Sequence, residues 1–140
     1  MIRFFSEDVP FKPSGIRNLR QWLEKVVHHQ QRSVGEISYI FCSDQYLLKM
    51  NRDYLHHDYF TDVITFGYNE GKTVSGDVFV SIERVRDNAK SMGVSVSEEL
   101  HRVMVHGLLH LLGHKDKKPS DIVKMRAAEE DCLRMLRKMK

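Results

Sequence analysis

Apolar residues in the first half of the chain alternate between strand-like runs and helical spacing. The short apolar run Ile2–Phe5 predicts a strand. After Ser14, apolar residues recur every three or four positions, which predicts a helix with Ser14 as its N-cap and Gly35 at its end. Residues 36–43 are rich in Ile, Tyr and Phe and predict a second strand, and residues 44–55 predict a short helix.

The second half of the chain opens with a hairpin pattern and continues with helices. Residues 61–71 and 76–82 are β-branched segments, and a turn that contains Gly and Asn joins them, which predicts two paired strands. A helix is expected over 83–93, where Gly93 ends it.

The next helix is apolar nearly all round, which is typical of a buried helix. Its N-cap is either Ser95, because Glu98 three residues later completes a capping-box pattern, or Ser97. Gly113 stands where a left-handed C-terminal cap is expected. A last helix is predicted to start near Ser120.

The order of these elements, β-α-β-α-β-β-α-α-α, is not the strict alternation of a doubly wound fold. It predicts an α+β fold with a mixed four-stranded sheet packed with about five helices. The 140 residues fit a single domain over 1–140. Composition does not change this picture, because 41% hydrophobic and 29% charged residues are ordinary values for a globular protein.

Hydrophobicity, cysteine content and charge indicate where in the cell the protein acts and which partners it can have. No apolar run approaches the about 20 residues of a membrane span, and the N-terminus has no apolar core of signal-peptide length. We therefore expect a cytoplasmic protein with no membrane partner. Cys42 and Cys132 are too few for a disulfide framework and are interpreted as small buried residues. The net charge of +3 is compatible with a nucleic-acid partner and does not demand one.

Candidate chemistry centres on His106 and His110, which lie four residues apart on the buried helix and so share one face. Buried imidazoles need partners for their ring nitrogens, and the neighbouring Val, Leu and Gly side chains supply none. A metal ion would satisfy one nitrogen of each ring, and zinc commonly binds such a pair. The pattern predicts one Zn²⁺ per chain. The alternative is two core histidines bonded to backbone carbonyls.

His114 and Asp116 are the candidates for a third ligand. Gly113 is expected to end the helix before His114, which takes His114 off the shared face, whereas a turn at Gly113 can bring Asp116 back toward the metal. The pattern H-x3-H-x2-G-x2-D has the spacing of the metzincin motif, with Asp in the third ligand position. We therefore predict a metzincin-like metal-binding helix with His106, His110 and Asp116 as ligands.

Three protein ligands leave a fourth coordination position for water, as in catalytic zinc sites. The metal lowers the pKa of that water from about 15.7 toward about 7, so metal-bound water is the expected nucleophile or general base. Zinc proteases carry a glutamate after the first histidine, and this position is Gly107 here. This argues against a protease. A hydrolase with another base and a non-haem iron oxygenase stay open.

Three stretches of the chain resemble the YbeY family, bacterial ribosomal-RNA maturation factors regarded as metal-dependent single-strand endoribonucleases. VHGLLHLLGHKD looks like the family's H-G-x-L-H-L-x-G-Y-D-H, and MNRDYLHHDYFTDVITF looks like its L-N-x-x-F/Y-R-x-x-D-x-x-T-D-V-L-S-F. GDVFVSIERV is similar to its G-D-I-x-I-S-x-E. The resemblance runs in the family's order from Met50 to Asp116, about half the chain. It implies the family's α+β fold, a zinc ion and work on ribosomal RNA.

Two positions depart from the family pattern. The family's third metal ligand is a histidine, and this chain has Asp116. The family also has an arginine, thought to act in catalysis, where this chain has Leu55. Arginine suits the developing charge of a phosphodiester through bidentate hydrogen bonds. The neighbouring Arg52, His56 and His57 are candidates to replace it, unless the HHD run is simply a polar loop.

Two further acids match the family's T-D and G-D motifs, Asp62 and Asp77. They are expected either to orient ligands or loops from behind the metal site or to cap strand ends.

The resemblance implies a zinc-dependent endoribonuclease for single-stranded ribosomal RNA, acting in maturation of the 3′ end of the small-subunit RNA and in ribosome quality control. The expected partners are that RNA and the ribosomal small subunit or its proteins, with no nucleotide cofactor. The alternative is a non-catalytic ribosome-assembly factor with a structural metal site, and the missing arginine favours it.

Overall fold

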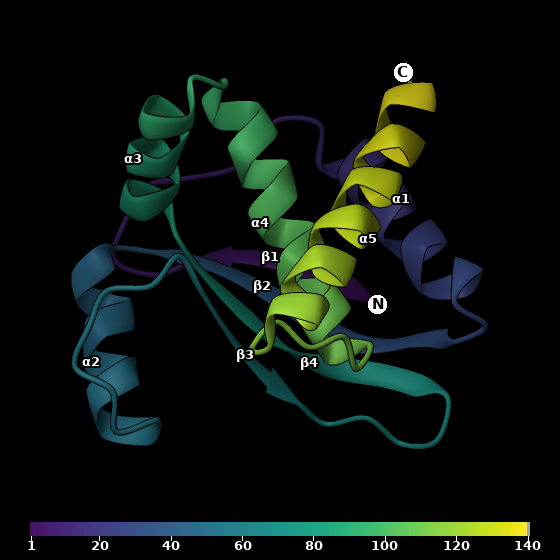
Figure 1. Cartoon of the computed structure of the whole chain (residues 1–140), viewed down its shortest axis with the longest axis horizontal. Coiled ribbons are helices and arrows are strands. Elements are labelled where there is room, and N and C mark those ends of the chain that lie inside the picture. The colour runs from purple at the N-terminus through teal and green to yellow at the C-terminus, as the bar shows by residue number, and fades with distance from the viewer. Residues whose placement is uncertain (140) are drawn as a thin grey trace.

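The computed structural model describes residues 1–139, which form four strands and five helices in the predicted order. The strands are β1 (Ile2–Ser6), β2 (Ser33–Cys42), β3 (Val63–Gly67) and β4 (Thr73–Ser81). The helices are α1 (Ile16–His29), α2 (Asp44–Tyr54), α3 (Ile82–Met92), α4 (Val96–Leu111) and α5 (Pro119–Lys138). The predicted α+β class is confirmed (Figure 1). None of the helices formed by these residues combines the length and the apolar character that crossing a membrane requires.

The sheet is mixed, with the strand order β1-β2-β4-β3. The pairs β1–β2 and β2–β4 are parallel, and β3 runs antiparallel to β4. The predicted hairpin is therefore present, and β3 is an outer strand. This position matters because the candidate site lies beside β3.

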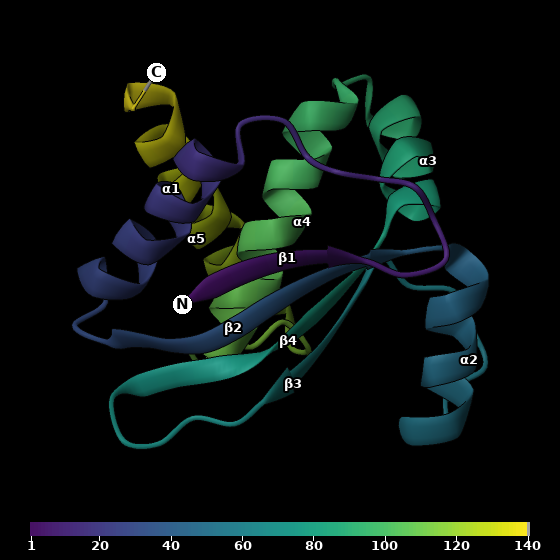
Figure 2. The same cartoon turned by 180° about the vertical axis from the view of Figure 1, so that it is seen from behind.

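Helices cover both faces of the sheet (Figures 1 and 2). On one face, α1 and α4 pack on the strands and α5 packs on both of these helices. On the other face, α2 packs through a smaller apolar cluster. Successive side chains of a strand point to opposite faces, so Val78 and Val80 of β4 join the α4 side while Phe79 joins the α2 side. Cys42 and Cys132 are buried free thiols, as expected.

Helix α4 is buried, as its apolar pattern predicts. The Ser95 hydroxyl accepts a hydrogen bond from the Glu98 backbone N–H at 3.1 Å, so Ser95 and not Ser97 is the N-cap. At the other end Gly113 has φ +100, and the next backbone N–H, that of His114, donates to the Leu109 carbonyl at 2.9 Å. Gly113 therefore turns the chain at the helix end, as predicted.

Gly107 lets α4 lie close against the sheet. A Cβ at this position would come within 2.5 Å of Val78 Cγ1 and 3.3 Å of Val63 Cγ2. Carbon atoms prefer separations of about 3.5–4.0 Å, so a larger residue would push the helix away from β4. Close packing against β4 thus explains why position 107, where zinc proteases carry their catalytic base, is a glycine.

Two predicted ends of α1 are wrong. Gly15, with φ 67, occupies the N-cap position in place of Ser14, and it provides no side-chain hydrogen bond. At the C-terminal end Gln31 adopts φ 63 and turns the chain before Gly35. Gly35 lies inside β2, where the side chain of Ser75 leaves no room for a Cβ. This glycine marks close packing of two strands and not a helix end.

Candidate metal centre

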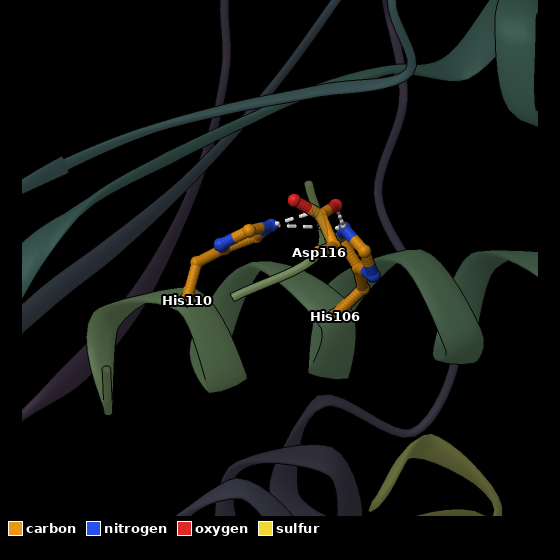
Figure 3. A group of neighbouring side chains, drawn as sticks. All are labelled: His106, His110 and Asp116. Atoms are coloured by element: carbon orange, nitrogen blue, oxygen red, sulfur yellow. Dashed lines mark hydrogen bonds and ion pairs between the residues drawn. The ribbon is translucent and has the colours of Figure 1, made fainter. Parts of the chain in front are cut away.

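Three residues predicted as ligands converge near the C-terminal end of α4 (Figure 3). The Nε2 atoms of His106 and His110 lie 3.1 Å apart. Oδ2 of Asp116 lies 3.3 Å from Nε2 of His106 and 3.2 Å from Nε2 of His110. The histidines project from one face of the helix, and Asp116 reaches them from the loop that follows Gly113.

The size of this triangle fits a metal ion. Zn–N bonds of about 2.0–2.1 Å at tetrahedral angles place two ligand atoms about 3.3–3.4 Å apart, and the observed separations are 3.1, 3.2 and 3.3 Å. The exposed fractions of the His106, His110 and Asp116 side chains are 17%, 27% and 36%. The cluster is therefore partly open, which leaves room for a further ligand from solvent or substrate.

Glu129 of α5 holds the His106 ring from the other side, a contact that the sequence analysis missed. Its Oε2 accepts a hydrogen bond from Nδ1 of His106 at 2.5 Å, which leaves Nε2 of that ring to face the cluster. Glu129 is only 2% exposed, and burial by itself raises the pKa of its carboxyl. The hydrogen bond and charge of His106, together with the charges of Arg102 and Arg126, outweigh burial and lower that pKa.

Arg102 joins Glu129 to two other acids. Its Nη1 lies 3.3 Å from Oε1 of Glu129, and its Nη2 lies 2.5 Å from Oε2 of Glu99 and 3.8 Å from Oδ2 of Asp62. Since Glu99 and Glu129 are 1% and 2% exposed, the guanidinium gives each of these two buried carboxylates a partner of opposite charge. The hydrogen bond to Glu99 raises the pKa of Arg102, so this cation stays charged.

A sequence signal for Glu129 does exist. The buried residues of α5 recur at helical spacing, and they are Met125, Glu129, Cys132 and Leu136. An acid within an apolar stripe implies a buried charge that needs a partner. The stripe does not say which partner, because α4 and α5 are separate helices whose relative position comes from packing.

The structure brings Asp62 to the cluster but not Asp77. Asp62 lines the same cavity as the three predicted ligands and accepts a hydrogen bond from Asn88 Nδ2 at 3.2 Å. Burial raises the pKa of Asp62, against the opposing charges of Arg102 and His106. Asp77 points to the α2 face of the sheet, where it accepts a hydrogen bond from the Tyr68 hydroxyl at 3.1 Å.

His114, the other candidate for the third ligand, is directed away from the cluster. Its Nε2 lies 3.2 Å from Oε1 of Gln30, and it lines a different cavity together with His29 and Cys132. Burial, with the neighbouring charge of His110, lowers the pKa of His114. This geometry favours Asp116 as the third ligand.

The three predicted ligands line a cavity of about 320 Å³ beside β3. Of the residues considered as substitutes for the family arginine, His57 lines this cavity, as does Leu55. Arg52 points elsewhere and pairs with Asp58 at 2.5 Å in an exposed ion pair. His56 has φ 57 and is not among the lining residues that the structure describes.

Comparisons with known proteins cover nearly the whole chain. The sequence model of a family described as "Endoribonuclease YbeY" matches residues 5–137. Proteins of that name from Porphyromonas gingivalis and Cytophaga hutchinsonii are 47% and 49% identical, over 97% and 94% of this chain and 90% and 93% of their own length. A solution structure from Thermotoga maritima is 26% identical, with a TM-score of 0.64 over 99% of this chain and 93% of that one. This chain therefore belongs to the YbeY family.

Proposed function

We propose that this protein is a zinc-dependent endoribonuclease that cleaves single-stranded ribosomal RNA. His106, His110 and Asp116 hold one Zn²⁺. The relatives named "Endoribonuclease YbeY" support the reaction. The observation that carries the proposal is the ligand triangle, with atoms 3.1, 3.2 and 3.3 Å apart. It supports metal binding by this chain despite an aspartate where the family pattern has a histidine.

The chain's own residues prepare the site for this reaction. Bound zinc would supply a Lewis acid that activates water near neutral pH and polarises a phosphoryl oxygen. Glu129 fixes the tautomer and orientation of His106, and Arg102 in turn holds Glu129. Asp116 adds a negative charge that a third histidine would lack, so the metal it binds is a weaker Lewis acid.

The biological setting that we propose is maturation of the 3′ end of the small-subunit ribosomal RNA, together with ribosome quality control. The ribosomal small subunit or its proteins are the proposed partners. Because RNA binding releases counterions from phosphates, affinity is expected to fall as salt concentration rises.

The test compares cleavage of a single-stranded ribosomal RNA fragment by zinc-loaded wild type, His110→Ala and His114→Ala, prepared identically. We expect cleavage by wild type and by His114→Ala, and none by His110→Ala. The His114 variant is the matched control because its ring contacts Gln30. Equal cleavage by all three proteins would point to a contaminating nuclease and contradict the proposal.

One observation favours a second function, a ribosome-assembly factor with a structural metal. Among residues 1–139, those that line the metal cavity include neither arginine nor lysine. This alternative predicts that wild type does not cleave RNA and that ribosome binding survives in His110→Ala.

A further inference from the structure

An aromatic pair lines the metal cavity. The rings of His57 and Tyr59 stack, with centroids 5.1 Å apart and planes inclined by 19°. The Tyr59 hydroxyl and Nδ1 of His57 are 3.0 Å apart, so a polar contact accompanies the stacking of the two rings. Both residues are exposed, Tyr59 by 56%, and both line the cavity that contains the three metal ligands. A ligand that enters the cavity therefore meets ring surface.

Asn51 of α2 ties down the loop that carries this pair. This residue is 2% exposed, and its Nδ2 donates a hydrogen bond to the Tyr59 carbonyl at 2.9 Å. Its backbone carbonyl accepts hydrogen bonds from the N–H groups of His57 at 2.9 Å and Leu55 at 3.2 Å. These contacts order the loop in the absence of RNA, which reduces the entropy lost when a ligand binds.

We propose that His57 and Tyr59 form a stacking platform for one unpaired nucleobase of the substrate RNA, beside the phosphodiester that is cleaved. The inference rests on the proposed function and gives a physical reason for a single-stranded substrate. A base within a duplex is already stacked and paired, whereas a base in a single strand can turn out onto an aromatic side chain.

The charges around the pair favour a base over a phosphate as its ligand. Arg52, the nearby cation in sequence, is already paired with Asp58. The family pattern has an arginine at the position of Leu55. In this chain Leu55 is 39% exposed and lines the cavity. In this segment the substrate is therefore held by stacking on the rings of His57 and Tyr59, and not by a positively charged side chain. Stacking of one base on an aromatic side chain is worth roughly 5- to 150-fold in affinity.

The experiment measures RNA binding without cleavage. Short single-stranded RNAs that carry the fluorescent base 2-aminopurine are titrated with protein in the presence of a chelator, so that quenching reports stacking. Tyr59→Ala is expected to weaken binding roughly 5- to 150-fold and to abolish the quenching. Tyr59→Phe keeps the ring and should retain both. Tyr68→Ala is the matched control, because Tyr68 is 59% exposed and lines the separate cavity on the α2 face.

A second RNA, abasic at the reporting position, separates stacking from general weakening, with affinity measured through an end label. Wild type should bind the abasic RNA as weakly as Tyr59→Ala binds the intact RNA, and Tyr59→Ala should not distinguish the two. Equal losses on both RNAs, or unchanged binding by Tyr59→Ala, would overturn the platform. Wild type that binds and quenches but does not cleave with zinc would support the platform and contradict the proposed nuclease.

Discussion

Asp116 is the residue at which the metal cluster of this chain departs from the family pattern. It reaches the two histidines from a loop, so its position depends on the turn at Gly113, where φ is +100. Two histidines and one carboxylate form a ligand set that catalytic zinc sites use. We therefore expect the aspartate to alter the charge of the site and to leave the number of protein ligands unchanged.

Replacing the two candidates for the third ligand tests this assignment. Asp116→Ala is expected to lower zinc affinity by more than the about 10–100-fold that loss of an outer hydrogen-bond partner costs, because it removes a direct ligand. His114→Ala should leave the affinity unchanged, since Nε2 of His114 contacts Gln30. Competition with a chromogenic chelator measures both affinities. The reverse order of effects would assign the third ligand to His114.

Glu129 contacts His106 and is expected to act on a bound metal through this ring, and its exposed neighbour Glu130 provides a control. Glu129→Gln keeps an acceptor for Nδ1 of His106 but removes the charge that strengthens this ligand, so zinc affinity should fall about 10–100-fold. Glu130→Gln removes an acid whose side chain is 54% exposed and pairs with Arg137, and it should have no effect. Chelator competition again provides the measurement, and equal affinities of the two variants would refute the role of Glu129.

At the scale of single helices and strands, the periodicity of the sequence predicts those features that depend on one segment of the chain alone. The predicted ligands His106, His110 and Asp116 belong to one helix and the loop after it, so their spacing along the chain is enough to predict that they meet. The contact between His106 and Glu129 joins two helices, and the link between Asn51 and Tyr59 joins a helix to a loop. Such contacts depend on how elements pack, which the periodicity of one segment does not contain.

Two glycines show that the pattern of one segment does not distinguish a helix end from close packing of strands. Gly113 and Gly35 both follow an apolar helical segment, and both were predicted to end a helix. Gly113 does so, with φ +100, whereas Gly35 lies in β2 at a point where Ser75 of the neighbouring strand leaves no room for a Cβ. The sequence pattern is alike in the two places because the strand that packs against Gly35 is far away along the chain.

Gly107 sets the distance between α4 and the sheet, so enlarging it tests the packing that positions the cluster. The methyl group of Gly107→Ala would meet Val78 Cγ1 at 2.5 Å. We expect a loss of about 1–3 kcal/mol in the free energy of unfolding, as is usual for overpacking. Ser97→Ala is an exposed change on the same helix and should stay within about 0.5 kcal/mol. Urea unfolding distinguishes them, and equal stabilities would show that the helix yields without cost.

Across the whole molecule, the sheet separates two cavities that have different lining residues. On the α4 side, one cavity is lined by the predicted metal ligands, by Asp62 and by the aromatic pair His57 and Tyr59. On the α2 side, Asp77 and Tyr68 line a second cavity of about 590 Å³. The G-D motif thus contributes to a different surface from the histidine motif, although both belong to the same family pattern.

The predicted metal cluster also links two consecutive helices, α4 and α5. The predicted ligands lie on α4 and the loop before α5, and Glu129 links His106 to α5 itself. Because the unfolded chain does not hold this triangle, zinc should bind the folded state and stabilise it. At free zinc of about 100 times the dissociation constant, mass action adds about 2.7 kcal/mol to the free energy of unfolding. For a chain of this length, that corresponds to a rise of roughly 5–10 °C in Tm.

Thermal unfolding of wild type, His110→Ala and His114→Ala, each with zinc and with chelator, checks this prediction. The Tm of wild type and of His114→Ala should fall by this amount when the chelator replaces zinc. The Tm of His110→Ala should be the same in both conditions. A wild-type Tm that does not respond to zinc would contradict metal binding by this cluster, whatever the protein does to RNA. A shift that persists in His110→Ala would place the bound zinc elsewhere, because loss of one of three ligands removes the geometry on which tight binding depends.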